Sequence, residues 1–105
     1  MAVLIDAPMW PGPRGLCWSH LISDVTFDEL HAFAAELELP PRLFERDHYD
    51  VPETLYDRAV LLGAEPVSCR AIVTRLHAAG LRRRKPPSVA PAQARQDQQI
   101  GGRNL

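Results

Sequence analysis

The sequence of 105 residues lacks a hydrophobic run long enough to cross a membrane. It also lacks the basic segment that precedes the apolar stretch of a signal peptide. Its two cysteines, Cys17 and Cys69, lie far apart, and no CxxC pair is present. We therefore expect a cytoplasmic protein whose cysteines are reduced, buried thiols, without a disulfide or a paired metal site.

Several motifs that identify enzymes are also missing. The sequence has no Walker loop, no GxGxxG, no HExxH and no GxSxG. These absences exclude the usual forms of nucleotide-binding proteins, zinc hydrolases and serine hydrolases. Any activity must therefore be read from individual polar residues and their placement.

Negative and positive charges are unevenly distributed along the chain. Residues 1–81 contain six arginines against twelve aspartates and glutamates, a balance of −6. A basic cluster follows, made of Arg82, Arg83, Arg84 and Lys85. Because an acidic body repels a phosphate backbone, we expect no nucleic-acid partner except through this cluster. A solvated helix end is the simpler interpretation of the cluster.

Composition and length indicate one small globular domain. Hydrophobic residues make up 46% and charged residues 24% of the chain, which is ordinary for a soluble domain. We place the domain at residues 1–81 and a basic cluster with a disordered tail at residues 82–105, because the tail has almost no large apolar side chains. A chain of this size buries a limited share of its surface, so a homodimer is a further expectation.

Short apolar runs alternate with helical patterns along the domain. We predict extended segments at residues 2–6, 16–22, 47–51 and 64–67. Helices are predicted after the capping box of Thr26 and Glu29, over residues 52–62, and from Ser68 to Gly80. This alternation predicts an α/β fold: a small two- or three-layer domain with a short parallel or mixed sheet and about three helices.

Four polar residues are candidates for catalysis: Asp6, His20, His48 and Asp50. Asp6 ends the first strand, and ligands of open α/β sheets bind beyond the carboxyl ends of strands. His20 shares a strand face with Trp18. His48 and Asp50 project to one side of an extended segment, and a histidine beside a carboxylate is suited to proton transfer.

Three residues are candidates for substrate binding: Trp10, Trp18 and Arg58. Trp10 lies in a proline-rich loop and is suited to stack on a ligand, whereas core packing is the simpler explanation for Trp18. Arg58, like Arg70, is suited to bind a phosphate or carboxylate group. Pairing of these arginines with neighbouring carboxylates is the simpler alternative.

The catalytic candidates also have structural explanations. Asp50 lies just ahead of Pro52 and is suited to cap the helix that follows. His20 is explained equally well as a histidine whose ring nitrogens are satisfied within the protein. His31 and His77 are expected at or near the surface.

Several of these side chains are of the types that bind divalent metal ions: Asp6, His20, Asp24, His31, His48 and Asp50. No two of them lie four residues apart on a predicted helix, and none forms a CxxC pair, which are the spacings that identify a metal site from sequence. A divalent metal is therefore not favoured at this point, and the cofactor is left open.

A pattern of four segments runs through residues 2–81: Ile5-Asp6, Trp18-Ser19-His20-Leu21, Glu29-Leu30-His31-Ala32-Phe33-Ala34 and His48-Tyr49-Asp50. In this pattern the sequence resembles a small bacterial and phage family, domain of unknown function 4031. The resemblance implies an independent domain and transfers no catalytic role to any residue.

Two hypotheses of function follow from the residues. The first is a small hydrolase or transferase that acts on a phosphate-bearing or nucleotide-like substrate through a His/Asp site. The second is a non-enzymatic binding or accessory module whose histidines and tryptophans are structural. Convergence of His20, His48 and Asp6 in space distinguishes them, because proton transfer requires groups within hydrogen-bond reach of a common substrate.

Overall fold

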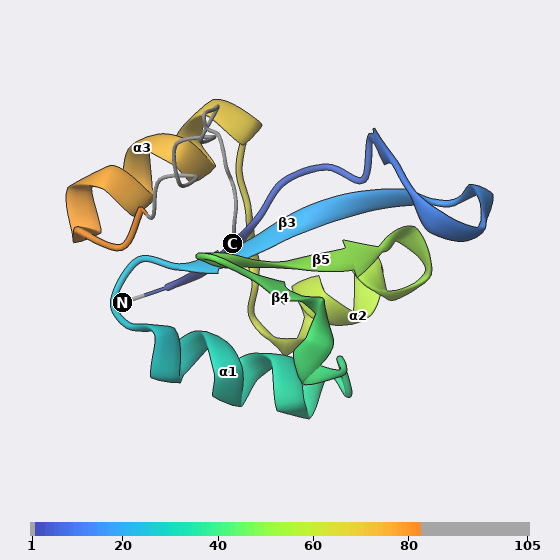
Figure 1. Cartoon of the computed structure of the whole chain (residues 1–105), viewed down its shortest axis with the longest axis horizontal. Coiled ribbons are helices and arrows are strands. Elements are labelled where there is room, and N and C mark those ends of the chain that lie inside the picture. The colour runs from blue at the N-terminus through green and yellow to red at the C-terminus, as the bar shows by residue number, and fades with distance from the viewer. Residues whose placement is uncertain (1, 83–105) are drawn as a thin grey trace, which may run out of the picture.

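The computed structural model describes residues 2–82 and shows a mixed sheet covered by helices (Figure 1). The strands are β1 (Val3–Ile5), β2 (Trp10–Pro11), β3 (Cys17–Ser23), β4 (Phe44–Glu45), β5 (His48–Pro52) and β6 (Glu65–Pro66). The α-helices are α1 (Phe27–Glu36), α2 (Tyr56–Leu62) and α3 (Cys69–Ala79), and the 3-10 turns are η1 (Pro13–Gly15), η2 (Pro41–Leu43) and η3 (Glu53–Leu55). The predicted small α/β domain, with a mixed sheet and three helices, is confirmed. The predicted disordered tail from residue 83 onward lies outside the described residues.

The sheet has six strands in the order β4-β5-β3-β1-β6, with β2 paired to the outer part of β3. All strand pairs are antiparallel except the parallel pair of β1 and β6. The long strand β3 lies at the centre and pairs with β1, β2 and β5. Among the helices of residues 2–82, none is long and apolar enough to span a membrane.

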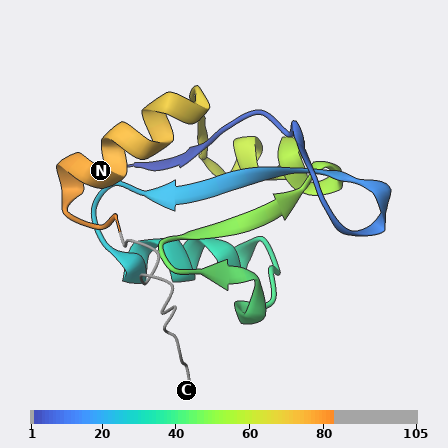
Figure 2. The ribbon, with the colours of Figure 1, turned by 45° about the horizontal axis from the view of Figure 1, so that its top comes forward.

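Alternation of side chains along the strands produces two cores, one on each face of the sheet. Val3, Ile5 and Leu21 pack with α1 and α2 in a core of eleven buried residues. Leu4 and Ile22, their neighbours in sequence, point to the opposite face. There they meet Ile72 and Leu76 of α3 in a core of four buried residues, against which the partly buried Ala2, Val67 and Leu81 pack. Figure 2 shows α3 and α1 on opposite sides of the sheet, so the fold has three layers.

The start of α1 confirms one half of the predicted capping box. The Thr26 hydroxyl accepts a hydrogen bond from the backbone N–H of Glu29 at 3.0 Å. The Glu29 carboxylate does not accept the hydrogen bond from the Thr26 N–H that a full capping box requires. It accepts from the Ser23 hydroxyl at 2.5 Å, and Ser23 in turn accepts from the Thr26 N–H at 3.2 Å. A buried serine at the end of β3 thus replaces the direct contact and ties α1 to the sheet.

The predicted cap at Asp50 is wrong. The segment after β5 begins as the 3-10 turn η3, whose cap residue is Pro52 and makes no side-chain hydrogen bond. Asp50 lies within β5, where it pairs with His20 of β3. Because side chains alternate along a strand, this register places Asp50 on the same face as His20, away from the helix that it was expected to cap.

Helix α3 is fixed at both ends as predicted. The Ser68 hydroxyl accepts from the Ala71 N–H at 3.1 Å, and Gly80 ends the helix in the left-handed conformation with a φ of 73°. Between these ends, Arg75 donates to the Asp24 carboxylate at 2.8 Å. This ion pair joins α3 to the turn that follows β3.

The Asp24–Arg75 pair is expected to stabilise the fold only above acid pH. Burial acts to raise the pKa of Asp24, but hydrogen bonds from Arg75 and the Ala2 N–H, with the charge of Arg75, lower it below its usual 3.8. A carboxylate with a lowered pKa stabilises the folded state above its unfolded-state pKa and loses that contribution as the pH falls. Because Arg75 is 41% exposed, we expect Asp24→Asn to cost less than about 1 kcal/mol near neutral pH.

Urea unfolding at neutral pH and at about pH 3 measures this contribution. The stability difference between the wild type and Asp24→Asn should shrink towards zero at the lower pH. Adding Arg75→Gln to Asp24→Asn should cause little further loss at neutral pH. An equal difference at both pH values would show that Asp24 acts through its shape and not through its charge.

Candidate functional site

Asp6 and His20 form a buried pair at the point where β1 leaves the sheet. One oxygen of Asp6 accepts the backbone N–H of His20 at 2.6 Å, so the side chain continues the ladder of hydrogen bonds. The other oxygen lies 2.8 Å from Nδ1 of His20 and 3.3 Å from Nε1 of Trp10. Asp6 is only 1% exposed. The contact through Nδ1 sets the orientation of the His20 ring and leaves Nε2 to face a ligand.

A second pair of the same kind involves His48. Nδ1 of His48 lies 2.9 Å from an oxygen of Asp47, which is also 1% exposed. The turn between β4 and β5 brings the two residues together. Its central residue, Arg46, has a φ of 56°, and the Asp47 N–H donates to the Glu45 carbonyl at 2.6 Å across it. A non-glycine residue at positive φ costs energy, and such strain concentrates at functional sites.

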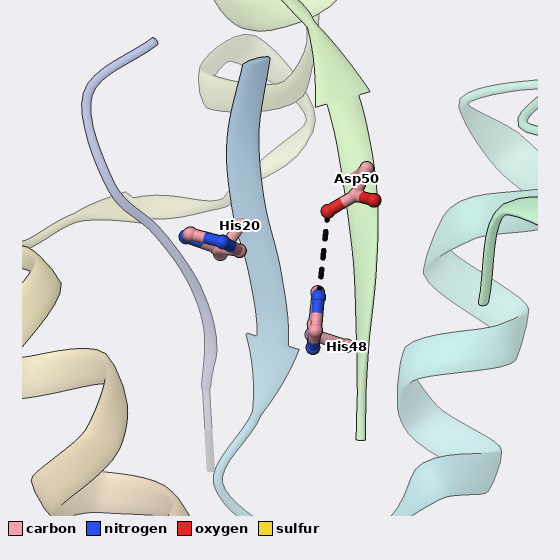
Figure 3. A group of neighbouring side chains, drawn as sticks. All are labelled: His20, His48 and Asp50. Atoms are coloured by element: carbon pink, nitrogen blue, oxygen red, sulfur yellow. Dashed lines mark ion pairs between the residues drawn. The ribbon is translucent and has the colours of Figure 1, made fainter. Parts of the chain in front are cut away.

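The two histidines meet on one face of the sheet together with Asp50. Their ring centroids are 5.0 Å apart in a T-shaped arrangement. Nε2 of His48 lies 3.4 Å from a carboxylate oxygen of Asp50. Figure 3 shows His48 directed along β5 towards Asp50, with His20 on the neighbouring strand β3. One ligand atom from each of the three residues lies within 4.8 Å of the others.

His48 carries an altered pKa. Burial acts to lower the pKa of the imidazole, but its hydrogen bonds to Asp50 and Asp47, with the charges of these two carboxylates, raise it more. The net result is a pKa above the usual 6.5. Asp47 at Nδ1 and Asp50 at Nε2 therefore place negative charge on both sides of this ring.

The histidines open into a hollow of about 550 Å³ between α3 and the strands β3 and β5, here called the arginine groove. Arg46 reaches it from the β4–β5 turn, Arg70 from the first turn of α3, and Arg82 from beyond the end of α3. Arg82 lies 3.6 Å from the buried carboxylate of Asp47. Neither Arg46 nor Arg70 has an ion-pair partner among residues 2–82. The groove therefore presents two uncompensated positive charges beside two histidines.

A second, smaller hollow of about 180 Å³, here called the tryptophan hollow, adjoins the same site. Trp10 and Trp18 line it together with Pro11 of β2, Pro13 of η1 and Asp50. Trp10 lines both hollows, and its ring centroid is 5.2 Å from that of His20. Trp18 donates from Nε1 to the Pro13 carbonyl at 3.3 Å. The site thus joins a basic hollow to an aromatic one.

The structure brings together most of the residues singled out from the sequence. Asp6, His20, His48 and Asp50 converge, and Trp10 contacts Asp6 and His20. Arg58 does not join them, because α2 packs on the opposite face of the sheet.

Other sequence expectations are corrected. Arg58 and Arg70 were expected to pair with carboxylates, and neither forms such a pair within the described part of the chain. Cys69 was expected to be buried, but as the first residue of α3 it is exposed, and it lines the arginine groove. His31 is exposed as expected and lies 2.7 Å from the Tyr49 hydroxyl.

Three residues of the site were not singled out as site candidates: Arg46, Asp47 and Arg82. Asp47 carried a signal, since it stands directly before His48. A carboxylate next to a histidine is a candidate for orienting the ring. Arg46 carried no signal, because its position depends on the turn at positive φ. Arg82 was considered only as part of the basic cluster, whose simplest interpretation was a solvated helix end.

Comparison with protein families identifies the domain. The family described as protein of unknown function, DUF4031, matches residues 3–79. The chain belongs to the DUF4031 family. The match runs from β1 to the end of α3 and therefore includes both histidines and their carboxylate partners. No curated protein and no solved structure matches the chain.

Proposed function

We propose that this DUF4031 domain is a small hydrolase that cleaves a phosphate ester of a nucleotide-like compound. The observation that carries the proposal is that the arginine groove combines three arginines with the two Asp–His pairs. Positive charge in a concave site binds a phosphate group, and oriented imidazoles beside it are suited to activate water.

The arginines support an anionic ligand. Arg46 and Arg70 lie on opposite sides of the groove, one on the sheet side and one on α3. Guanidinium groups bind phosphate oxygens in a bidentate manner. The domain body is acidic overall, with a balance of −6 over residues 1–81, so these local charges favour a compact phosphate group over a long polyanion.

The tryptophan hollow supports the nucleotide-like part of the substrate. A flat aromatic or heterocyclic group stacks favourably on indole rings. Because Trp10 borders both hollows, a ligand that fills them places its phosphate beside the arginines and its ring beside the tryptophans. The scissile bond then lies near the histidines.

The reaction is a displacement at phosphorus. The oxygen of a water molecule forms a bond to phosphorus, and the bond from phosphorus to the ester oxygen breaks. The water gives up one proton, and the departing alkoxide takes up one proton, so the sum of atoms and charge is unchanged. His20, His48 and Asp50 surround the position of the water, and the arginines stabilise the charge on the phosphoryl oxygens.

Hydrolysis of chromogenic phosphate esters tests the proposal. We expect turnover of p-nitrophenyl phosphate esters and faster turnover of a nucleoside p-nitrophenyl phosphate diester. His20→Ala should lower kcat by at least about 100-fold. Arg46→Ala and Arg70→Ala should each raise KM about 10-fold or more, because each removes a charged hydrogen bond worth about 1.5–3 kcal/mol.

Arg42→Ala is the matched control, because Arg42 is exposed on η2 and lines neither hollow. It should leave both kcat and KM unchanged. Saturable binding of the nucleotide probes without any turnover would contradict the hydrolase and support the non-enzymatic binding module.

A further inference from the structure

We infer that His20, His48 and Asp50 bind one zinc ion at the border between the arginine groove and the tryptophan hollow. Binding of the ion follows from the geometry of the three side chains. Its role, the activation of water, rests on the proposed hydrolase.

The three side chains form a compact donor set. One ligand atom from each lies within 4.8 Å of the others, and modest movement of the side chains brings three such atoms around one ion. Two imidazoles and one carboxylate, completed by water, are a donor set of catalytic zinc sites. All three side chains come from the paired strands β3 and β5, in which His20 is directly opposite Asp50. Their backbone positions are therefore held by the sheet.

The surroundings of the histidines distinguish this site from a chance grouping. Histidines that bind metal usually donate their other ring N–H to a carboxylate, which orients the ring and increases its basicity. Both histidines have such a partner: Asp6 contacts Nδ1 of His20 at 2.8 Å, and Asp47 contacts Nδ1 of His48 at 2.9 Å. Both aspartates are buried. Each contact leaves Nε2 as the nitrogen for the ion.

The third ligand is placed differently from the two buried aspartates. Asp50 is 42% exposed, and its contact with His48 is long, at 3.4 Å. Its carboxylate therefore keeps oxygen lone pairs for an ion. Asp50 faces the tryptophan hollow, whereas His20 and His48 face the arginine groove. An ion held by these three residues stays accessible to water and to substrate from both sides.

The ion supplies the water activation that the hydrolysis needs. A zinc-bound water has a pKa of about 7, so hydroxide is available at neutral pH. The proton of this water passes to solvent when hydroxide forms. The hydroxide oxygen then bonds to phosphorus as the ester bond breaks, and the alkoxide takes a proton from solvent. Arg46 and Arg70 hold the phosphoryl oxygens during this step.

Calorimetric titration of Zn²⁺ into the full chain, purified without a histidine tag and freed of metal with a chelator, tests the site. We expect a stoichiometry of one and a Tm that rises by about 10 °C at saturating zinc. Co²⁺ should bind in its place and show visible absorption bands of a low-coordinate site. His20→Gln, His48→Gln and Asp50→Asn should each weaken zinc binding at least 100-fold.

His77→Gln is the matched control, because His77 is exposed on α3 and lines neither hollow. It should bind zinc like the wild type. Circular dichroism establishes that each variant is folded, and Asp50→Asn keeps the size of the side chain. Absence of stoichiometric binding to the folded wild type, or equal loss in His77→Gln and His20→Gln, would overturn the zinc site.

Two outcomes separate the zinc site from the proposed function. Stoichiometric zinc binding without hydrolysis of any phosphate ester supports the site and overturns the hydrolase. Hydrolysis that persists at full rate in chelator-treated protein of verified zero metal content supports the hydrolase and overturns the role of zinc in activating water, while the titration alone decides whether the three residues bind the ion.

Discussion

Asp6→Ala is expected to lower the free energy of unfolding by about 3 kcal/mol, which corresponds to a fall in Tm of about 15 °C. The buried carboxylate accepts from the backbone N–H of His20 and contacts Nδ1 of His20 and Nε1 of Trp10. Alanine removes a buried carboxylate and leaves these three groups without their acceptor. The cost is largest for the backbone N–H, because the side chains of Trp10 and His20 are partly exposed and can reach water. Urea and thermal unfolding measure the loss.

Asp6→Asn distinguishes the structural role of Asp6 from its role in orienting His20. The amide oxygen still accepts the backbone N–H, so most of the stability should remain. The amide nitrogen donates and cannot accept a hydrogen bond from Nδ1–H, so the ring loses the tautomer that Asp6 favours. We expect zinc affinity to fall about 10- to 100-fold while Tm changes little. Unchanged zinc affinity in a folded Asp6→Asn protein would show that the carboxylate does not position the ring.

Leu76→Ala is expected to release α3 from the sheet at a cost of about 3 kcal/mol. The side chain is fully buried, and α3 contributes only Leu76 and Ile72 to the four-residue core on its face. Loss of one of two anchors leaves the helix with little apolar contact to offset its conformational entropy. Since α3 carries Arg70 and forms one wall of the arginine groove, the proposed binding of phosphate esters should be lost with it.

Leu30→Ala provides the comparison on the other face. Leu30 is also fully buried, but it belongs to the core of eleven residues shared by the sheet, α1 and α2. Its truncation should destabilise the whole domain by a similar amount. Amide hydrogen exchange separates the two effects. Leu76→Ala should accelerate exchange in α3 alone, whereas Leu30→Ala should accelerate it in every element. Uniform acceleration in Leu76→Ala would show that α3 and the sheet unfold as one unit.

Local patterns predicted the three helices and four of the six strands, because their signals lie within a few residues, but they missed the two-residue strands β2 and β4. Ser68 caps α3 and Gly80 ends it, as the short-range chemistry of helix ends requires. The alternation of His48 and Asp50 around Tyr49 likewise predicted which side chains share a face. The error at Asp50 arose where two local explanations competed. A residue shortly before a helix is suited both to cap the helix and to belong to the strand that precedes it, and pairing with β3 places Asp50 in the strand.

The candidate site was predicted only in part, because it depends on contacts distant in sequence. Nothing local to His20 indicates that Asp50 lies opposite it, since this follows from the register between β3 and β5. Metal spacing rules recognise ligands on one helix or one tight turn. Ligands on two paired strands escape such rules. The groove itself is visible only once α3 is placed over the sheet.

The positions of the two tryptophans give the domain an optical property. Trp10 and Trp18 are the only tryptophans of the chain, and both line the tryptophan hollow instead of either hydrophobic core. The Trp10 ring lies 5.2 Å from that of His20, close enough for the imidazole to quench its emission. Binding of a metal ion or a nucleotide at the proposed site is therefore expected to change the intrinsic fluorescence, so that the proposed titrations need no added label.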